Sequence, residues 1–239
     1  MRVAQIGERR EQLIRSRARA LAHKYLTLPG RTLPVDPRAI ATELLGLGFE
    51  EPEEIGTVLG GNSMRVEVVG AFDRTQRKII VARRGCNATT RRFTAAHEIG
   101  HYEIHPGLSL LRESPRTEPE IRTALRTPRE READIFASEF LIPSDHLADF
   151  FGRMFGTAID GSQLTDDDAY LLSEGNLRAS QMMQMEPLEL AKLVAKGSSF
   201  VRSDSRSLVE IFDVSTTAMA IQLLDSRLVS KSSSKGQVR

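Results

Sequence analysis

Residues 93–104 read FTAAHEIGHYEI, an apolar helical segment that carries two histidines four residues apart. At that spacing His97 and His101 project from one helix face, with their Cβ atoms about 6 Å apart. Their imidazole nitrogens can then reach one tetrahedral ion at about 2.1 Å. Glu98 is rotated to the side, where it can hold a water, and Gly100 leaves room for a close neighbouring element. This HExxH pattern predicts a zinc site with the two histidines as ligands and Glu98 as the catalytic residue.

A catalytic zinc needs a third protein ligand, and several carboxylates follow the motif. We favour Glu130, because Glu130 and Asp134 are four residues apart and share a helix face. Asp134 could then accept the ring N–H of a ligating histidine. Glu132 is the alternative ligand, but it points roughly 200° around the helix from Glu130, which favours an outward surface charge. His105 is about 12 Å along the helix axis from His97, so it is excluded as a third ligand.

The apolar periodicity divides the chain of 239 residues into helical and strand-forming parts. Amphipathic spacing predicts helices over residues 8–26, from Pro37, over 89–105 and over 128–142. Residues 55–82 have the pattern of β-strands, and we expect a small antiparallel sheet of about three strands. The predicted fold class is therefore α+β, with a small antiparallel sheet beside the helices that carry HExxH and ExxxD.

The C-terminal part is predicted to be helical, with segments that begin near Asp166, Pro187 and Ser207. We expect three regions: a domain with the metal site, a helical extension with a helix-turn-helix-like end, and a disordered tail. These regions span residues 8–152, 153–229 and 230–239. The stretch 107–127 is rich in Pro, Arg and Glu and is predicted to be a mobile loop.

The composition is that of an ordinary globular protein, and the formal net charge of +1 argues against a general attraction to nucleic acid or acidic lipid. The arginines of residues 8–26 are predicted to form a solvated face, with a docking surface for an acidic partner or DNA as the alternative. One cysteine, Cys86, excludes an intramolecular disulfide and fits a reducing compartment. Without a secretory signal or an apolar run of membrane-spanning length, the chain is expected to be cytoplasmic.

Two segments resemble the ImmA/IrrE family of bacterial and phage metallopeptidases. Residues 91–102 read RRFTAAHEIGHY, and residues 130–143 read EREADIFASEFLIP. Weaker similarities, LPVD near the N-terminus and FDVS near the C-terminus, extend the resemblance over most of residues 10–228. The resemblance implies a zincin-like domain of the gluzincin kind. It also implies a zinc-dependent endopeptidase that performs limited proteolysis of a helix-turn-helix transcriptional repressor, which derepresses mobile-element or stress genes.

The resemblance also implies roles for individual residues. His97, His101 and Glu130 match the family's ligand positions, and Glu98 matches the catalytic position. The family often has Asn where this chain has Asp134, a departure that keeps a hydrogen-bonding side chain.

Several alternatives stay open at this point. The chain could be a regulatory metal-sensing module, or a DNA- or repressor-binding module, with little or no proteolysis. Direct DNA binding is not favoured, because the helix predicted over 216–226 has no basic reading face. Zinc suits the ligand set best, with manganese as the other candidate ion. Tyr102, His105 and Tyr170 are candidates for oxyanion or substrate contacts.

Overall fold

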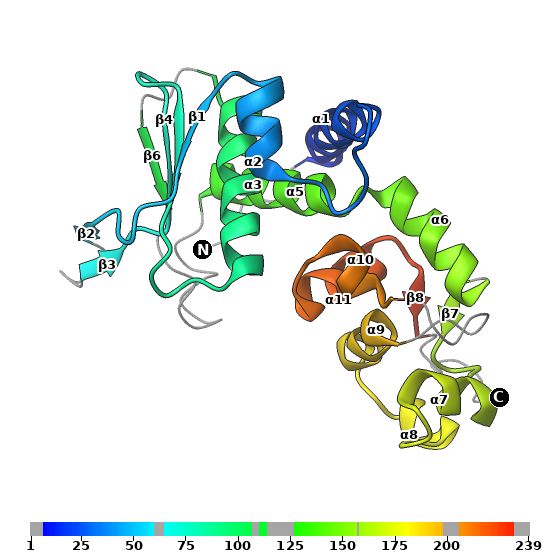
Figure 1. The fold of residues 1–239 in the computed structure, drawn as a ribbon. Helices are drawn as coiled ribbons and strands as arrows, with labels where there is room; N and C mark the ends of the chain where they lie inside the picture. Colours follow the sequence, from blue (N-terminus) through cyan, green and yellow to red (C-terminus); the bar gives the residue numbers. More distant parts are fainter. Residues whose placement is uncertain are drawn as a thin grey trace. The chain divides into compact units, whose positions relative to one another are not determined.

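The computed structural model describes residues 7–59, 65–106, 110–113, 127–156, 158–197 and 206–231. The chain forms two compact units, divided between Leu141 and Ile142. The first unit combines helices with a small sheet, and the second is mainly helical (Figure 1). The α+β fold class predicted from the sequence is therefore confirmed. The predicted domain limits, with a boundary near residue 152, stay a prediction.

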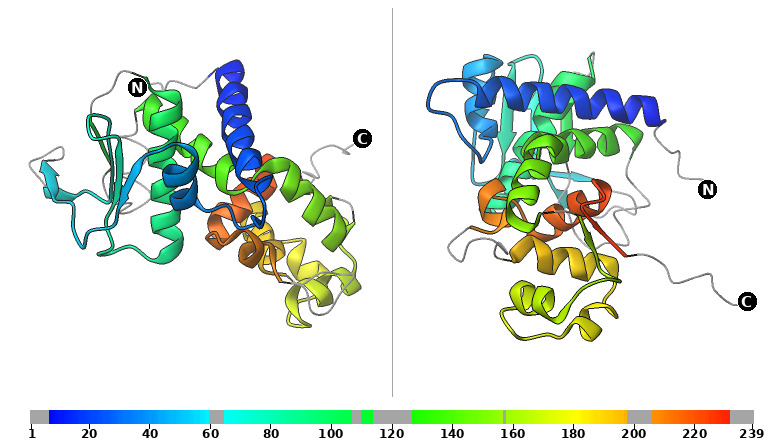
Figure 2. Two further views of the ribbon diagram at one scale, coloured as in Figure 1. Left: turned by 45° about the horizontal axis from the view of Figure 1, so that its top comes forward. Right: turned by 90° about the vertical axis from the view of Figure 1, so that its right-hand side faces the viewer.

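The helices of the first unit pack around the segment that carries HExxH. Helix α3 contacts strands β4 and β5 on one side and helix α5 on the other, and α5 in turn packs along α1 (Figures 1 and 2). The short helix α2 continues directly as the π-helical turn η1, which ends at Leu44, two residues before Gly46 with its positive φ of 61°. The bounds are α1 (Glu8–Leu26), α2 (Pro37–Ala39), η1 (Ile40–Leu44), α3 (Ala88–Ile104) and α5 (Pro128–Leu141).

The main sheet has four strands in the order β1-β5-β4-β6. Strand β4 is antiparallel to β5, as expected, and also to β6, whereas β1 runs parallel to β5. A parallel pair needs a long connection, and residues 51–77 provide it, with the separate antiparallel hairpin β2–β3 inside the connection. The bounds are β1 (Gly48–Glu50), β2 (Thr57–Leu59), β3 (Arg65–Glu67), β4 (Gly70–Asp73), β5 (Lys78–Val81) and β6 (Leu110–Glu113).

Strand β6 corrects the prediction of a mobile loop over 107–127. Its four residues pair with β4. Among the described residues, no other strand offers hydrogen-bond partners to the backbone N–H and C=O groups on that edge of β4. The remaining parts of the predicted loop up to residue 126 lie outside the described residues.

Helix α3 begins at Ala88 and is capped by Asn87, whose side chain accepts a hydrogen bond of 2.8 Å from the backbone N–H of Thr90. We expect Asn87→Ala to lower the free energy of unfolding by about 1 kcal/mol, because a backbone donor in the first turn then loses its partner. Asn87→Ser keeps a capping oxygen and is expected to retain most of the stability. Urea denaturation compares the two variants, and equal stability of both would contradict the capping role.

The second unit consists of short helices and one two-stranded parallel sheet. Helices α9 and α11 lie side by side, and α11 buries Met219, Ala220 and Leu223 (Figure 2). Ser230 belongs to strand β8, so the predicted disordered tail does not begin at residue 230; residues 232–239 lie outside the described part. The bounds are α6 (Ser144–Phe155), β7 (Ile159–Asp160), α7 (Asp166–Ser173), α8 (Ala179–Met182), α9 (Pro187–Lys196), α10 (Leu208–Phe212), α11 (Thr216–Asp225) and β8 (Val229–Ser230).

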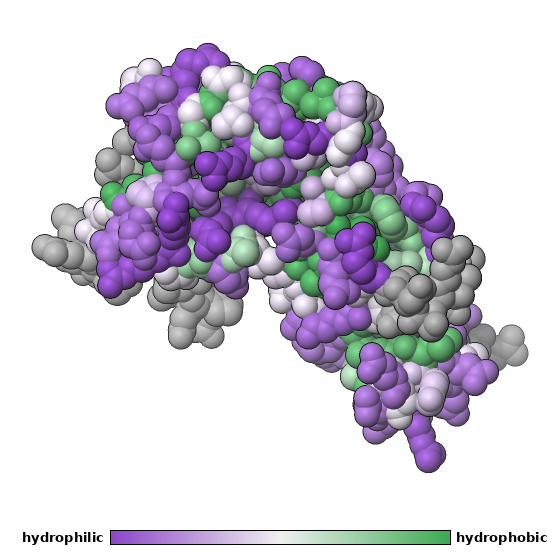
Figure 3. Space-filling model, viewed as in Figure 1, coloured by the Kyte–Doolittle hydropathy of each residue, from purple (hydrophilic) through white to green (hydrophobic). Residues whose placement is uncertain are grey.

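The surface of the first unit is mainly hydrophilic on the face drawn in Figure 3, where apolar residues show only in small separated groups. Its apolar side chains instead fill the space between α3, α5, α1 and the sheet, as the complete burial of Ile14, Ile79, Ile99 and Phe136 shows. Among the described residues, no helix combines the length and the apolar character that a membrane span requires.

Candidate metal centre

The close approach of α3 and α5 positions the candidate site. Gly100 faces α5, where a Cβ atom would lie only 3.2 Å from the Cβ, Cγ and Cδ1 atoms of Phe136. Ala133, Phe136 and Ala137 are fully buried on the facing side of α5. The absence of a side chain at Gly100 therefore lets the two helices pack closely, as the sequence predicted, and brings the start of α5 beside the HExxH segment.

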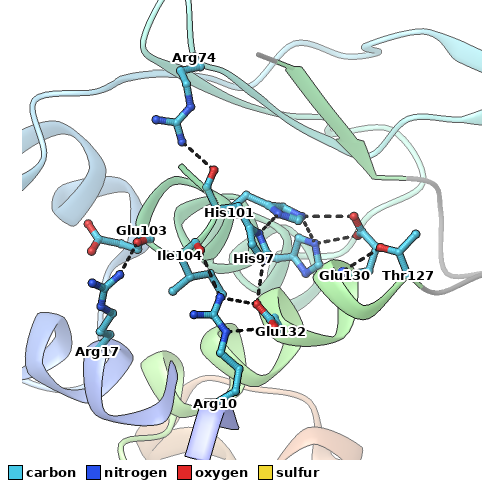
Figure 4. A network of polar contacts seen from close by, with 11 residues as sticks. Arg10, Arg17, Arg74, His97, His101, Glu103, Ile104, Thr127, Glu130 and Glu132 are labelled. Atoms are coloured by element: carbon cyan, nitrogen blue, oxygen red, sulfur yellow. Dashed lines mark hydrogen bonds and ion pairs between the residues drawn. The ribbon is translucent and has the colours of Figure 1, made fainter. Parts of the chain in front are cut away.

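Three residues of the two helices place their ligand groups close together, and we call these two imidazole nitrogens and the Glu130 carboxylate the triangle. His97 Nε2 lies 3.0 Å from His101 Nε2 and 3.2 Å from Glu130 Oε2, and His101 Nε2 lies 3.5 Å from Glu130 Oε1. Figure 4 shows the Glu130 carboxylate pointing at both imidazole rings. The structure thus brings together the ligand set that was predicted from the sequence, and His97, His101 and Glu130 could hold a metal ion.

The triangle fits the size of a tetrahedral zinc site. Bonds of about 2.1 Å to a tetrahedral ion place two ligand atoms about 3.4 Å apart, and the three measured separations lie on both sides of that value. Two imidazole nitrogens and one carboxylate are also the donor types that zinc prefers. The residues present therefore fit a zinc ion, and the same set accommodates manganese less well because it holds two nitrogens.

Asp134 sets the tautomer of His97. Its Oδ1 atom lies 3.1 Å from His97 Nδ1, on the opposite side of the ring from the triangle. A carboxylate only accepts hydrogen bonds, so we assign the ring proton of His97 to Nδ1 and the lone pair to Nε2. The predicted role of Asp134 as the residue that orients a ligating histidine agrees with this geometry.

Glu130 is held in its charged form. It lies in the first turn of α5, where its backbone N–H donates to Thr127 Oγ1 and the helix dipole favours a carboxylate. Burial alone would raise the pKa of Glu130, but its hydrogen bonds to His101 and His97 outweigh burial and hold that pKa well below its ordinary value. The exposed fraction of its side chain is 27%, against 1% and 2% for the histidines, so solvent reaches the triangle from the Glu130 side.

Glu98 lies on the sheet side of α3, beside Gly70 of β4. Its residue is fully buried, and its Oε1 atom is 2.8 Å from the position that a Cβ atom would take on Gly70 of β4. The backbone of β4 can approach the carboxylate this closely only because residue 70 has no side chain. A glycine at this position is a site feature that sequence reasoning missed, because it depends on the contact between β4 and α3.

Glu132 and His105 occupy positions that differ from the predictions. Glu132 accepts two hydrogen bonds from Arg10, at 2.6 and 3.1 Å, and lies 3.0 Å from His105 Nε2, so it is not an outward surface charge. The other ring nitrogen of His105 lies 2.8 Å from His101 Nδ1. Burial lowers the pKa of His105, opposed in part by the hydrogen bond to Glu132. With both ring nitrogens engaged, His105 is suited to positioning its neighbours rather than to contact with an oxyanion.

The prediction of a solvated arginine face on α1 is wrong for Arg10, Arg15 and Arg19, which pair with carboxylates of α5, whereas Arg9 and Arg17 are exposed. Besides Arg10, Arg15 and Arg19 each lie 3.5 Å from the carboxylate of Glu139, whose side chain is only 1% exposed. The acidic partner of this basic face is α5 of the same chain. The signal was present in the sequence, because Arg15 and Arg19 are four residues apart and therefore share a face.

The two candidate tyrosines lie in different units. The Tyr102 ring packs edge-to-face on Phe72 of β4 at 5.5 Å and lies within 5.9 Å of the Arg74 guanidinium. Tyr170 belongs to the second unit and is 64% exposed. Contacts of either residue with an oxyanion or a substrate stay a prediction.

Residues 57–160 match the family model Peptidase_M78, described as the IrrE N-terminal-like domain. This segment is similar to M78 peptidase domains. The matched part includes all of α3 and α5, and with them the HExxH segment, Glu130 and Asp134. The resemblance to the ImmA/IrrE family is thereby confirmed. Among curated proteins, none matches the chain.

Proposed function

We propose that this protein is a metal-dependent endopeptidase that holds zinc through His97, His101 and Glu130. The observation that carries the proposal is the triangle of ligand atoms, with separations of 3.0, 3.2 and 3.5 Å and the donor types of a zinc site. The similarity of residues 57–160 to a peptidase family supports the same function. Manganese is the alternative ion in cells.

Glu98 is the general base in this proposal. Its carboxylate takes a proton from the attacking water and later delivers that proton to the departing amine. A zinc ion bound by the triangle would lower the pKa of water and polarise the peptide carbonyl. Asp134 keeps the Nε2 lone pair of His97 directed at the site, and the burial of Glu98 and both histidines strengthens the charge interactions there.

The proposed substrate is a helix-turn-helix transcriptional repressor, cut by limited proteolysis so that mobile-element or stress genes are derepressed. Its support is the resemblance of the HExxH and ExxxD segments to the ImmA/IrrE family, together with the domain match. The second unit buries the apolar residues of α11 against α9, which favours a packing role for the helix-turn-helix-like end over direct DNA binding.

Metal removal tests the function directly. We expect the purified protein to contain about one zinc per chain and to cleave the repressor encoded beside it. Treatment with 1,10-phenanthroline should stop cleavage, and zinc added to the dialysed protein should restore it. Elemental analysis and gel electrophoresis provide the measurements. A protein without metal, or one whose binding to the repressor is intact while cleavage never occurs with zinc present, would instead identify a binding module.

A further inference from the structure

A chain of polar contacts leads away from the candidate metal site on the side of His101. It runs from His101 Nδ1 to His105 Nδ1 at 2.8 Å, from His105 Nε2 to Glu132 Oε2 at 3.0 Å, and from Glu132 to Arg10 at 2.6 and 3.1 Å. It links α3, α5 and α1 (Figure 4 shows the Arg10 and Glu132 end). His105 is buried, and the side chain of Glu132 is only 15% exposed.

The far end of this chain determines where the ring protons lie. Arg10 is always charged and only donates, so Glu132 is held as a carboxylate that only accepts. His105 therefore donates from Nε2 and, as a neutral ring, accepts at Nδ1. His101 must then donate from Nδ1, which leaves the lone pair of His101 at Nε2. That atom belongs to the triangle with His97 and Glu130.

The backbone around His105 is held as firmly as its ring. His105 ends α3, and its carbonyl oxygen accepts a hydrogen bond of 3.3 Å from Arg74. The carbonyl oxygen of Ile104 accepts one of 3.4 Å from Arg10, which also binds Glu132. The last turn of α3 is thus fixed from two sides, and the ring of His105 cannot easily turn away from His101.

We propose that His105 and Glu132, anchored by Arg10, are positioning residues that orient the His101 ring for metal binding. They do on the His101 side what Asp134 does for His97, but through an additional imidazole. The proposal rests on the proposed metallopeptidase function, because His101 is taken as a metal ligand. Loss of a hydrogen-bond partner behind a ligating histidine typically weakens metal binding about 10–100-fold.

Zinc affinity of the full chain tests this arrangement without any activity assay. Competition with a fluorescent chelator should show the dissociation constant for zinc rising about 10–100-fold in His105→Leu, which removes both hydrogen bonds. His105→Asn keeps an acceptor near the Nδ1 position, so it should bind zinc several-fold more tightly than His105→Leu. With Co²⁺ in place of zinc, the visible absorption band of His105→Leu should shift because the His101 ring turns.

A matched pair of arginine variants controls for helix packing. Arg10→Ala should weaken zinc binding several-fold, whereas Arg17→Ala should not, although Arg17 also joins α1 to the end of α3 through a 2.9 Å hydrogen bond to the carbonyl of Glu103. Circular dichroism shows whether each variant is folded. If His105→Leu does not fold, the comparison of Arg10→Ala with Arg17→Ala decides the question. Wild-type affinity in His105→Leu and Arg10→Ala would overturn the positioning role alone. A wild-type protein that binds neither zinc nor Co²⁺ would overturn the proposed function as well.

Discussion

Replacement of Glu98 by Gln is expected to abolish peptide cleavage while the zinc content of the protein stays unchanged. Gln has the same shape but cannot take a proton from water, and a general base contributes about 10²–10⁴ to the rate. Glu98 does not belong to the triangle of His97, His101 and Glu130, so metal binding does not depend on its charge. Single-turnover cleavage of the repressor and elemental analysis of the same sample provide the two measurements.

The matched control is Glu103→Gln, the same substitution five residues further along α3. Glu103 is not part of the triangle. The Glu103→Gln variant should therefore cleave at a rate within about twofold of wild type, since substitutions outside catalytic and buried positions have small effects. Loss of zinc together with activity in Glu98→Gln would show that Glu98 supports the metal site rather than acting as the base. Cleavage close to the wild-type rate would end the general-base role.

The parts of the site that the sequence predicted depend on helix geometry within one segment. Four-residue spacing places His97 beside His101, and Glu130 beside Asp134, wherever the two helices lie. The order of the two segments and the missing side chain at Gly100 were then enough to predict that the two pairs meet. For the same reason the bounds of α1, α3 and α5 agree closely with the periodicity of their apolar residues.

The parts that were missed depend on contacts between distant segments. The pairing of Arg10 with Glu132 joins residues 122 positions apart, and no local spacing indicates it. Each residue alone has the pattern of a solvated helix surface, so the carboxylate was predicted to point outward. Strand β6 was missed in the same way. It lies in a Pro- and Arg-rich stretch without β-propensity, and it forms because it pairs with the backbone N–H and C=O groups at the edge of β4. Tertiary context overrides local propensity in both cases.

Gly70→Ala is expected to impair both the packing of β4 on α3 and catalysis. The new methyl group would overlap the Cγ2 atom of Thr94 and lie 2.8 Å from Glu98 Oε1. Gly70 is not among the residues with positive φ, so the backbone accepts alanine and the penalty is purely steric. Overpacking of a buried contact costs about 1–3 kcal/mol of unfolding free energy. The Glu98 carboxylate must also move, so the cleavage rate should fall by more than the loss of folded protein explains. Rates measured at 10 °C and divided by the folded fraction test this expectation.

A second substitution separates the two effects of the added methyl group. Thr94→Ser removes the Cγ2 atom, so Gly70→Ala with Thr94→Ser should regain much of the lost stability while the contact with Glu98 persists. Cleavage should therefore stay impaired in a protein that is again well folded. Gly152→Ala serves as the control, because its methyl group meets no atom within 4 Å and lies in helix α6, where alanine stabilises. If the double variant regains full activity along with its stability, the close approach of β4 serves folding alone, and the position of the Glu98 carboxylate does not depend on the glycine.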